Sequence, residues 1–239
     1  MCKKFVVFLL SVIYSVSAVS VPFIKKCEPS DSKCVLFNTV NTIPLFGAGI
    51  PELDVEPLDP LYIGKVDAST PNLKLVVDDL KVEGLKDCQV LSIEHDKANL
   101  KIYLNIECTV DLYGKYDMDG QLLILKLQGN GNAHFKLRNT QFNVICEHNE
   151  KIGKDGKIHY NIKNTKYTYD LKGKVDIELE NLLQGNEVLA AAAREVFTTN
   201  ANIIAEEIAP KFIKAVVDKI VKNVNNFFHA AAVEDIEIV

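Results

Sequence analysis

Residues 200–228 carry the one long helical pattern in the sequence, and this pattern limits what the chain can fold into. Spacings of three and four residues place its apolar members on one helical face. These members are Ile204, Ile208, Phe212, Ile213, Val216, Val217, Ile220, Val221, Val224 and Phe228. A second, polar stripe consists of Glu207, Lys211, Lys214, Asp218, Lys222 and Asn225. At 1.5 Å per residue the helix would be roughly 43 Å long, so it needs a long apolar partner surface.

The residues before this helix offer such a surface. From position 73 to 183 the apolar period changes to two, most clearly in residues 100–112. Such alternation is typical of antiparallel strands with one buried face. The sequence therefore predicts an α+β fold. In its plain form the helix packs on a sheet; in the sharper form a curved sheet wraps around the helix and leaves a tubular apolar cavity.

The alternation of the predicted strands changes phase in three places. Because a one-residue slip would turn side chains to the wrong face, an inserted bulge residue is expected at each slip. We place these bulges near Asp78-Asp79, Asn139-Thr140 and Asn164-Thr165. The alternative is a loop between two short strands at each place, but bends are favoured. Long bent strands lying side by side form a strongly curved sheet.

Glycine and proline residues predict where the regular elements end. Turns are expected at Gly114, Asp119-Gly120 (or a bulge there), Gly129-Asn130-Gly131 and Gly153-Lys154-Asp155-Gly156. Residues 35–46 predict a short helix or turn segment that ends at Pro44 at the latest. Residues 47–64 hold three glycines and three prolines and predict an extended segment pressed onto the fold.

A second helix is expected over residues 182–197, where the alternation stops. Residues 190–193 are alanines of high helix propensity, and Asn186 is the expected N-cap. Pro210 falls inside the long helical pattern and is expected to kink it or to mark a join between two segments.

The first 18 residues are typical of a secretory signal peptide. Lys3 and Lys4 form a basic start, residues 5–16 are mostly apolar, and small residues follow up to Ala18. We expect cleavage near Ala18 or Ser20, a single hydrophobic-ligand-binding domain over residues 19–239, and an extracellular location.

The net charge of the chain argues against two classes of binding partner, nucleic acids and anionic membranes. The formal charge is −5, and losing Lys3 and Lys4 makes it about −7. An acidic chain is a poor match for nucleic acid or for anionic membrane surfaces. No stretch after the leader reaches the ~20 apolar residues that span a bilayer, so no stable membrane insertion is expected.

Five cysteines follow the predicted leader. Cys27 and Cys34 close the short polar loop CEPSDSKC, whose composition suits a disulfide clamp. A zinc site there lacks a CxxC or a nearby histidine. Cys88 and Cys108 flank a turn and could face each other across a hairpin, or stay buried and reduced. With Cys146 the number is odd, so at least one cysteine has no intrachain partner.

Catalytic motifs are absent from the sequence, and no cofactor is expected. Cys146 and His148 share a strand face and could form a nucleophile pair or bind a metal, but no third group supports them. Asp117 and Asp119 are weak candidates for acid–base catalysis because their face is the solvated one. The sequence therefore favours a binding protein over an enzyme.

Several segments resemble the takeout and juvenile-hormone-binding protein family of insects. They are CEPSDSKC, GIPELDVEPLDPL at 49–61, YGKYDMDGQLLILKLQGNGNAHFKLRN at 113–139, LENLLQGNEVL at 179–189 and TNANIIAEEIAPKF at 199–212. The resemblance implies a secreted α+β fold in which a curved antiparallel sheet wraps a long helix. It also implies an internal tunnel for apolar ligands such as terpenoid hormones or lipids.

The resemblance further implies a disulfide between Cys27 and Cys34. The hormone carriers of the family have a second disulfide, whose pattern Cys88, Cys108 and Cys146 do not clearly reproduce. This difference favours the takeout-like branch.

Together these features predict a secreted carrier that binds a small hydrophobic ligand in an internal tunnel. The expected ligand-binding residues are Ile102, Leu104, Ile106, Met118, Leu122, Ile124, Phe135, Phe142, Val144, Phe197, Ile208, Phe212 and Val216. Alternatives are a lipid-transfer or microbial-lipid-recognition protein and, ranked last, a secreted hydrolase using Cys146 and His148. An unidentified receptor or donor protein is a further conceivable partner.

Overall fold

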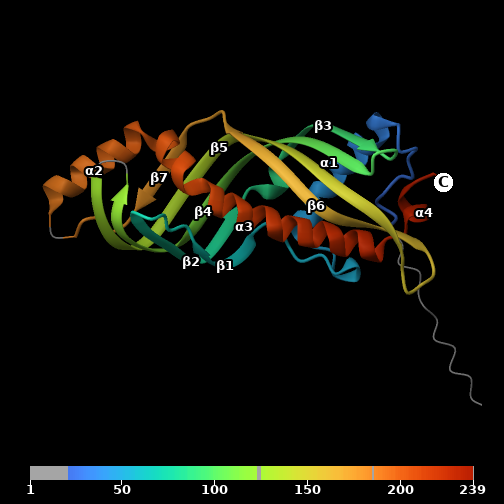
Figure 1. The fold of residues 1–239 in the computed structure, drawn as a ribbon, viewed down its shortest axis with the longest axis horizontal. Coiled ribbons are helices and arrows are strands. Elements are labelled where there is room, and N and C mark those ends of the chain that lie inside the picture. Colours follow the sequence, from blue (N-terminus) through green and yellow to red (C-terminus); the bar gives the residue numbers. More distant parts are fainter. Residues whose placement is uncertain (1–20, 123–124, 185, 239) are drawn as a thin grey trace, which may run out of the picture.

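A computed structural model describes residues 21–122, 125–184 and 186–238 (Figure 1). Its helices are α1 (Ser32–Ala48), α2 (Glu187–Thr199), α3 (Ala201–Ala230) and α4 (Val233–Ile236), with short 3-10 turns at Pro51–Leu53 and Leu85–Asp87. Its strands are β1 (Leu61–Asp67), β2 (Leu73–Glu83), β3 (Gln89–Asp96), β4 (Lys101–Leu122), β5 (Leu125–Ile152), β6 (Ile158–Leu171) and β7 (Val175–Leu179). The predicted signal peptide lies outside the described residues.

Two very long strands, β4 and β5, form the spine of the antiparallel sheet. They pair along almost their full length, and each outer edge carries two shorter strands in succession. β3 and then β2 pair along β4, while β7 and then β6 pair along β5. The seven-stranded sheet stays open between β1 and β6.

Bulges bend these strands at all three predicted places. The register shifts after Asp78 in β2, at Asn139 in β5 and beside Asn164 in β6. Asp79 and Asn139 have positive φ angles of 53° and 47°. The strands continue through each shift, so the prediction of bends is confirmed and the alternative of loops is wrong.

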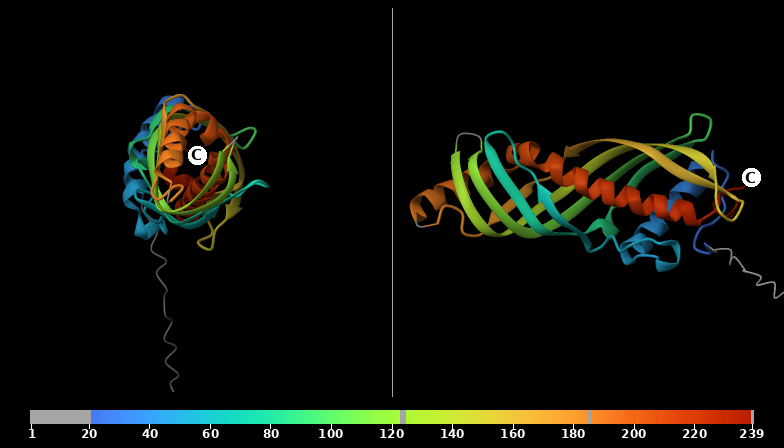
Figure 2. Two further views of the ribbon diagram at one scale, coloured as in Figure 1. Left: turned by 90° about the vertical axis from the view of Figure 1, so that its left-hand side faces the viewer. Right: turned by 60° about the horizontal axis from the view of Figure 1, so that its bottom comes forward.

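Helix α3 lies along the inside of the curved sheet and contacts β1, β6 and β7 (Figure 2). Asparagines fasten it to strand backbones. The Asn225 amide accepts from the Ile162 N–H at 2.7 Å and donates to the Ile162 carbonyl at 3.1 Å. Asn202 makes the same kind of pair with Val175 and Gly173. The helix therefore bridges the opening of the sheet, and the predicted wrapped α+β fold is confirmed.

One half of the wrapped sheet is filled by side chains. β2, the second half of β4 and the first half of β5 pack against α2 and the start of α3. Side chains there are almost completely inaccessible, for example Leu75, Val77, Leu80, Met118 and Ile204. This half has the dense packing of an ordinary core.

Helix α1 covers the other half, next to β3 and opposite the end that holds α2 (Figure 1). The Asp31 carboxylate caps its N-terminus by accepting from the Lys33 and Cys34 N–H groups. A disulfide joins Cys27 to Cys34 beside this cap, as predicted. Residues 47–64 then run across the fold with Leu53, Val55 and Leu58 buried, which confirms that this segment packs onto the fold. The prediction that it is extended throughout was wrong, because it includes the end of α1, the 3-10 turn Pro51–Leu53 and the start of β1.

Helix α1 continues through Pro44 to Ala48, so the prediction that it ends at Pro44 was wrong. Helix α3 continues through Pro210, so no join between two segments falls there. Each proline frees the carbonyl four residues earlier, on Val40 or Glu206. Both of those residues are exposed, so water can satisfy the freed carbonyl. The join between two helices falls at Asn200 instead, and Asn186 caps α2 as predicted.

Three predicted turns were also wrong, because β4 runs through Gly114 and Gly120 and β5 runs through residues 129–131. Glycine serves close packing there. A Cβ at Gly114 would collide with Val77, and one at Gly129 with the Tyr116 hydroxyl. The predicted turn at 153–156 is confirmed by the Gly156 N–H donating to the Gly153 carbonyl. In the described part of the chain, no helix is both long and apolar enough to cross a bilayer.

Candidate ligand-binding cavity

The half of the sheet beneath α1 encloses open space instead of a packed core. A cavity of about 470 Å³ lies between α1, the inner faces of β3 to β6 and most of the length of α3. The lining residues of α3 extend from Ala205 to Phe228, a helix length of about 35 Å. The cavity is thus elongated along the helix, and its volume falls in the range of about 300–1,000 Å³ usual for small-molecule sites.

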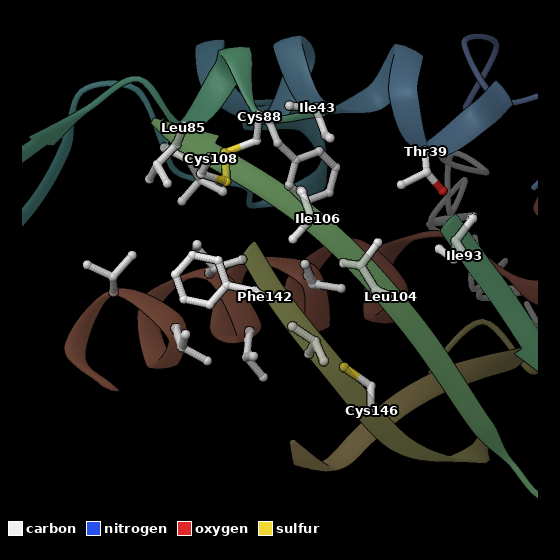
Figure 3. A pocket seen from close by; sticks show the side chains of 18 of the residues that line it. Thr39, Ile43, Leu85, Cys88, Ile93, Leu104, Ile106, Cys108, Phe142 and Cys146 are labelled. Carbon is white, nitrogen blue, oxygen red and sulfur yellow. A yellow bond between two sulfur atoms is a disulfide. The ribbon is translucent and has the colours of Figure 1, made fainter. Parts of the chain in front are cut away.

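Apolar side chains make up most of the cavity wall. Ile43 of α1, Leu104 and Ile106 of β4 and Phe142 of β5 point into the same space (Figure 3). These four side chains keep partial accessibility although they face inward. Inward-facing apolar surface that no neighbour covers is a surface that an apolar ligand can bury.

Sulfur atoms form part of the wall. Cys88 and Cys108 are joined by a disulfide between the start of β3 and β4, and both line the cavity (Figure 3). The sequence left open whether these two cysteines are bonded across a hairpin or stay reduced. The structure shows that they are bonded. Cys146 is the free cysteine of the described residues, and its thiol lies 3.8 Å from the Thr165 hydroxyl.

Polar groups gather at the cavity end formed by β3, β6 and the C-terminal segment. The Glu237 carboxylate accepts from the Tyr160 hydroxyl at 2.7 Å and from Lys97 at 2.9 Å. His95 Nδ1 lies 3.2 Å from the same carboxylate, and its Nε2 lies 3.0 Å from His148 Nε2. His95, Tyr160 and Glu237 line the cavity.

Burial and hydrogen bonding shift the protonation of this polar end. Burial alone would raise the pKa of Glu237, but the bonds from His95, Lys97 and Tyr160 outweigh it and lower this pKa to about 2. Burial, aided by the nearby His95, lowers the pKa of His148 to about 4. At neutral pH the cavity end therefore holds an ionised carboxylate beside a neutral imidazole.

Comparison with known proteins places the chain in a family. The sequence model for the family described as haemolymph juvenile hormone binding protein matches residues 5–237. The chain belongs to this family. The resemblance seen in the sequence is thereby confirmed.

Two proteins of Drosophila and one solved structure are similar to most of the chain. The circadian clock-controlled protein daywake of Drosophila melanogaster is 26% identical over 204 residues, which is 80% of this chain and 78% of the relative. The daywake protein of Drosophila yakuba matches with the same identity and coverage. The crystal structure of Epiphyas postvittana Takeout 1 superposes with a TM-score of 0.87 at 25% identity, covering 90% of this chain and all of the other.

Of the thirteen predicted ligand-binding residues of this family member, nine line the cavity: Ile102, Leu104, Ile106, Phe135, Phe142, Val144, Ile208, Phe212 and Val216. Three others, Met118, Leu122 and Phe197, belong to the packed core of the filled half. Ile124 lies outside the described residues. The structure therefore brings nine of the predicted residues together around the cavity and places the other three described ones, Met118, Leu122 and Phe197, in the packed core.

Cys146 and His148 do not form the pair that a hydrolase would need. Their hydrogen-bond partners are Thr165 and His95 respectively, and burial raises the pKa of the Cys146 thiol. A thiol with a raised pKa is a weak nucleophile at neutral pH. In the described part of the chain, no group of three or more histidine, cysteine or acidic side chains is placed to hold a metal ion.

Sequence reasoning missed the wall contributed by α1 and the polar end. Thr39 and Ile43 line the cavity from α1, and His95 and Glu237 close one end. The apolar character of residues 35–46 was a usable signal for α1, because it exceeds what one buried helix face requires. Glu237 gave no such signal, since its partners lie 77 or more residues away in sequence.

Proposed function

We propose that the protein is a secreted carrier that binds a small hydrophobic molecule in the cavity and makes no covalent bond with it. The observation that supports this most directly is the elongated cavity, whose wall is mostly apolar. Burial of apolar ligand surface would supply about 25 cal/mol per Å² of driving force. The family, named for hormone binding in haemolymph, points the same way.

Secretion is supported by the leader-like residues 1–18 and by two disulfides, Cys27–Cys34 and Cys88–Cys108. Disulfides of this kind persist in oxidising compartments and are rare in the cytosol. N-terminal sequencing of protein recovered from the culture medium of insect cells should find a start near residue 19 or 21. Retention of residues 1–18 in the recovered protein would contradict the proposal.

Binding can be followed with an added apolar fluorescent dye, because the chain contains no tryptophan. The folded protein should bind the dye at about one-to-one stoichiometry, since an apolar void favours an apolar guest over water. Terpenoids or long-chain lipids should displace the dye. Native mass spectrometry of protein purified from its source should show an extra mass that extraction identifies as a lipid. Absence of any dye or lipid binding would refute the carrier function.

Exchange of lipid with membranes is a second candidate, favoured by the outer face of α1. Phe37, Val40 and Leu45 are exposed on this helix, whose inner face lines the cavity. A helix with both faces apolar suits transient contact with a lipid surface. Transfer of a fluorescent lipid between vesicles should slow in a Phe37→Ser, Val40→Ser variant that still binds dye. Equal transfer rates would leave soluble carriage as the function.

A further inference from the structure

Charged groups are distributed unevenly around the cavity. None of the described residues that line it is a lysine or an arginine, and Glu237 supplies the one lining carboxylate. Lys97 sits on the outer side of that carboxylate with a side chain that is 40% exposed, and it does not line the cavity. A ligand inside the cavity therefore faces a carboxylate but no lysine or arginine side chain.

The hydrogen-bond donors around Glu237 are already engaged. Tyr160 and His95 bind one carboxylate oxygen, and Lys97 binds the other. An entering fatty-acid carboxylate would find these donors occupied and would lie beside a like charge. Like charges held close in a site of low polarity repel strongly, and a carboxylate moved there from water loses hydration without compensation.

An uncharged polar group fits the same place. The Glu237 oxygen that binds Lys97 has one recorded donor, whereas the other oxygen has two. A ligand hydroxyl can donate to that oxygen, because each carboxylate oxygen accepts about two hydrogen bonds. An ester can lie against the Tyr160 and His95 side chains without adding charge. The cavity end thus tolerates neutral oxygen functions and opposes anionic ones.

We propose that Glu237 makes the cavity selective for uncharged lipids, so that a long-chain alcohol or ester binds in preference to the fatty acid of equal length. This inference rests on the proposed carrier function. It assigns to Glu237 the exclusion of anionic ligands, with His95, Tyr160 and Lys97 as the groups that hold its carboxylate in place.

Competition for the cavity between three lipids that share the same length of carbon chain tests the selectivity. 1-Hexadecanol, methyl palmitate and palmitate are each titrated against the bound dye at pH 7.5, below the concentration at which the lipid aggregates. The two uncharged lipids should displace dye at concentrations at least tenfold lower than palmitate. If palmitate displaces dye as well as or better than hexadecanol, the selectivity is refuted while the carrier function stands. If none of the three binds, the carrier function itself fails.

Variants identify the responsible group. Glu237→Gln keeps the side-chain shape, removes the charge and frees Lys97, so the ratio between palmitate and hexadecanol should fall below threefold. Lys97→Met leaves the carboxylate without its exposed cation, and the ratio should widen at least threefold. Because Lys97 is partly exposed, this variant should fold even if Glu237→Gln does not. An unchanged ratio in Lys97→Met would overturn the assignment.

Glu234→Gln is the matched control. Glu234 belongs to the same C-terminal segment but pairs with Lys157 on the outside, with a side chain that is 57% exposed. Its replacement should leave the ratio at the wild-type value. A ratio that changes equally in Glu234→Gln and Glu237→Gln would mean that the segment's fold, and not the buried charge, sets the selectivity.

Discussion

Leu104 and Leu75 both face the inside of the curved sheet, yet their surroundings differ. Leu75 is completely buried among neighbours in the filled half. Leu104 lines the cavity and keeps part of its surface uncovered. Enlarging these two side chains should therefore have opposite effects on stability and on binding.

Leu104→Phe and Val144→Phe should weaken the binding of long lipids and leave the melting temperature nearly unchanged, because the larger rings occupy open space. Leu75→Phe should cost about 1–3 kcal/mol of unfolding free energy through overpacking and leave dye affinity nearly intact. Thermal melts and dye titrations of the three variants separate the two effects. A sharp loss of melting temperature in Leu104→Phe, with binding retained, would make Leu104 a core residue.

Buried His148 should make the protein sensitive to moderate acid. Its pKa is lowered to about 4 by burial, while the unfolded chain titrates near 6.5, so the unfolded state binds more protons between these values. The unfolding free energy should then fall by up to about 3 kcal/mol as the pH drops from 6.5 to 4. Glu237, with a pKa of about 2, should add a further loss below about pH 4.5.

Urea denaturation at several pH values measures this loss. His148→Phe keeps a planar ring and should flatten the decline between pH 6.5 and 4.5, with the two curves parallel above pH 7. An equal decline in the variant would assign the acid sensitivity to other groups, of which His229 is one, since burial also lowers its pKa.

The sequence predicted which side chains of β4 and β5 face inward, but not which of them meet open space. Met118 and Leu104 obey the same alternation, since both occupy even positions with apolar side chains. Their difference arises from what packs opposite them. Met118 lies in the packed core, while the wall opposite Leu104 is partly α1, about 60 residues earlier in the chain. Local periodicity contains no information about such distant packing.

Among the elements, the bent strands were predictable and their lengths were not. A phase slip in the alternation reports a bulge directly, as at Asp79 and Asn139. Glycine within a strand gives the same local signal as glycine in a turn. At Gly114 the deciding factor is the close approach of β2, which depends on the register of a strand more than 30 residues away.

The sequence pattern placed Asn225 on the polar stripe of the long helix, and the structure shows that asparagines of α3 bind backbone groups of neighbouring segments. Asn225 binds both backbone groups of Ile162, and Asn223 accepts from the Glu56 N–H at 2.7 Å while completely buried. Asparagine disfavours helix interiors, so its recurrence at 223, 225 and 226 was a signal that side-chain bonds outweigh propensity there.

Asn225→Ala should lower the unfolding free energy by about 1–3 kcal/mol, because it leaves the Ile162 N–H and carbonyl without partners. Lys214→Ala, which removes an exposed ion pair with Asp218 on the same helix, should change it by less than about 0.5 kcal/mol. Urea denaturation compares the two. A loss in Asn225→Ala no greater than in Lys214→Ala would show that water replaces the amide.

For the whole molecule, the length of the helical pattern and the curvature of the sheet predicted the wrapped form correctly. What they left open was how the two halves share the interior. The filled half receives side chains from β2, β4, β5 and α3, whereas the hollow half is spanned by α1 and crosslinked by Cys88 and Cys108. The crosslink replaces part of the cohesion that a packed core would supply.

Removing that crosslink should cost more than removing the N-terminal one. Cys88 and Cys108 are 20 positions apart and Cys27 and Cys34 are 7 apart. The chain-entropy estimate is then about 3 kcal/mol for the first bond and about 2 kcal/mol for the second. Double serine variants of each pair, compared by urea denaturation, test the order. A larger loss of unfolding free energy in Cys27→Ser, Cys34→Ser would mean that the N-terminal disulfide stabilises more of the fold than the loop it closes.

The interior is divided into a filled and a hollow half, so a bound lipid would complete the packing of the hollow half. Amide protons of β3, β6 and α1 should exchange with solvent faster than those of β2 in the empty protein. A bound lipid should slow them by mass action, in proportion to its concentration above the dissociation constant. Exchange of the β2 amides requires local opening of the filled half, which the lipid does not contact. Their protection should therefore stay constant. The rate of deuterium exchange in β3, β6 and α1 would thus show whether the protein carries a lipid.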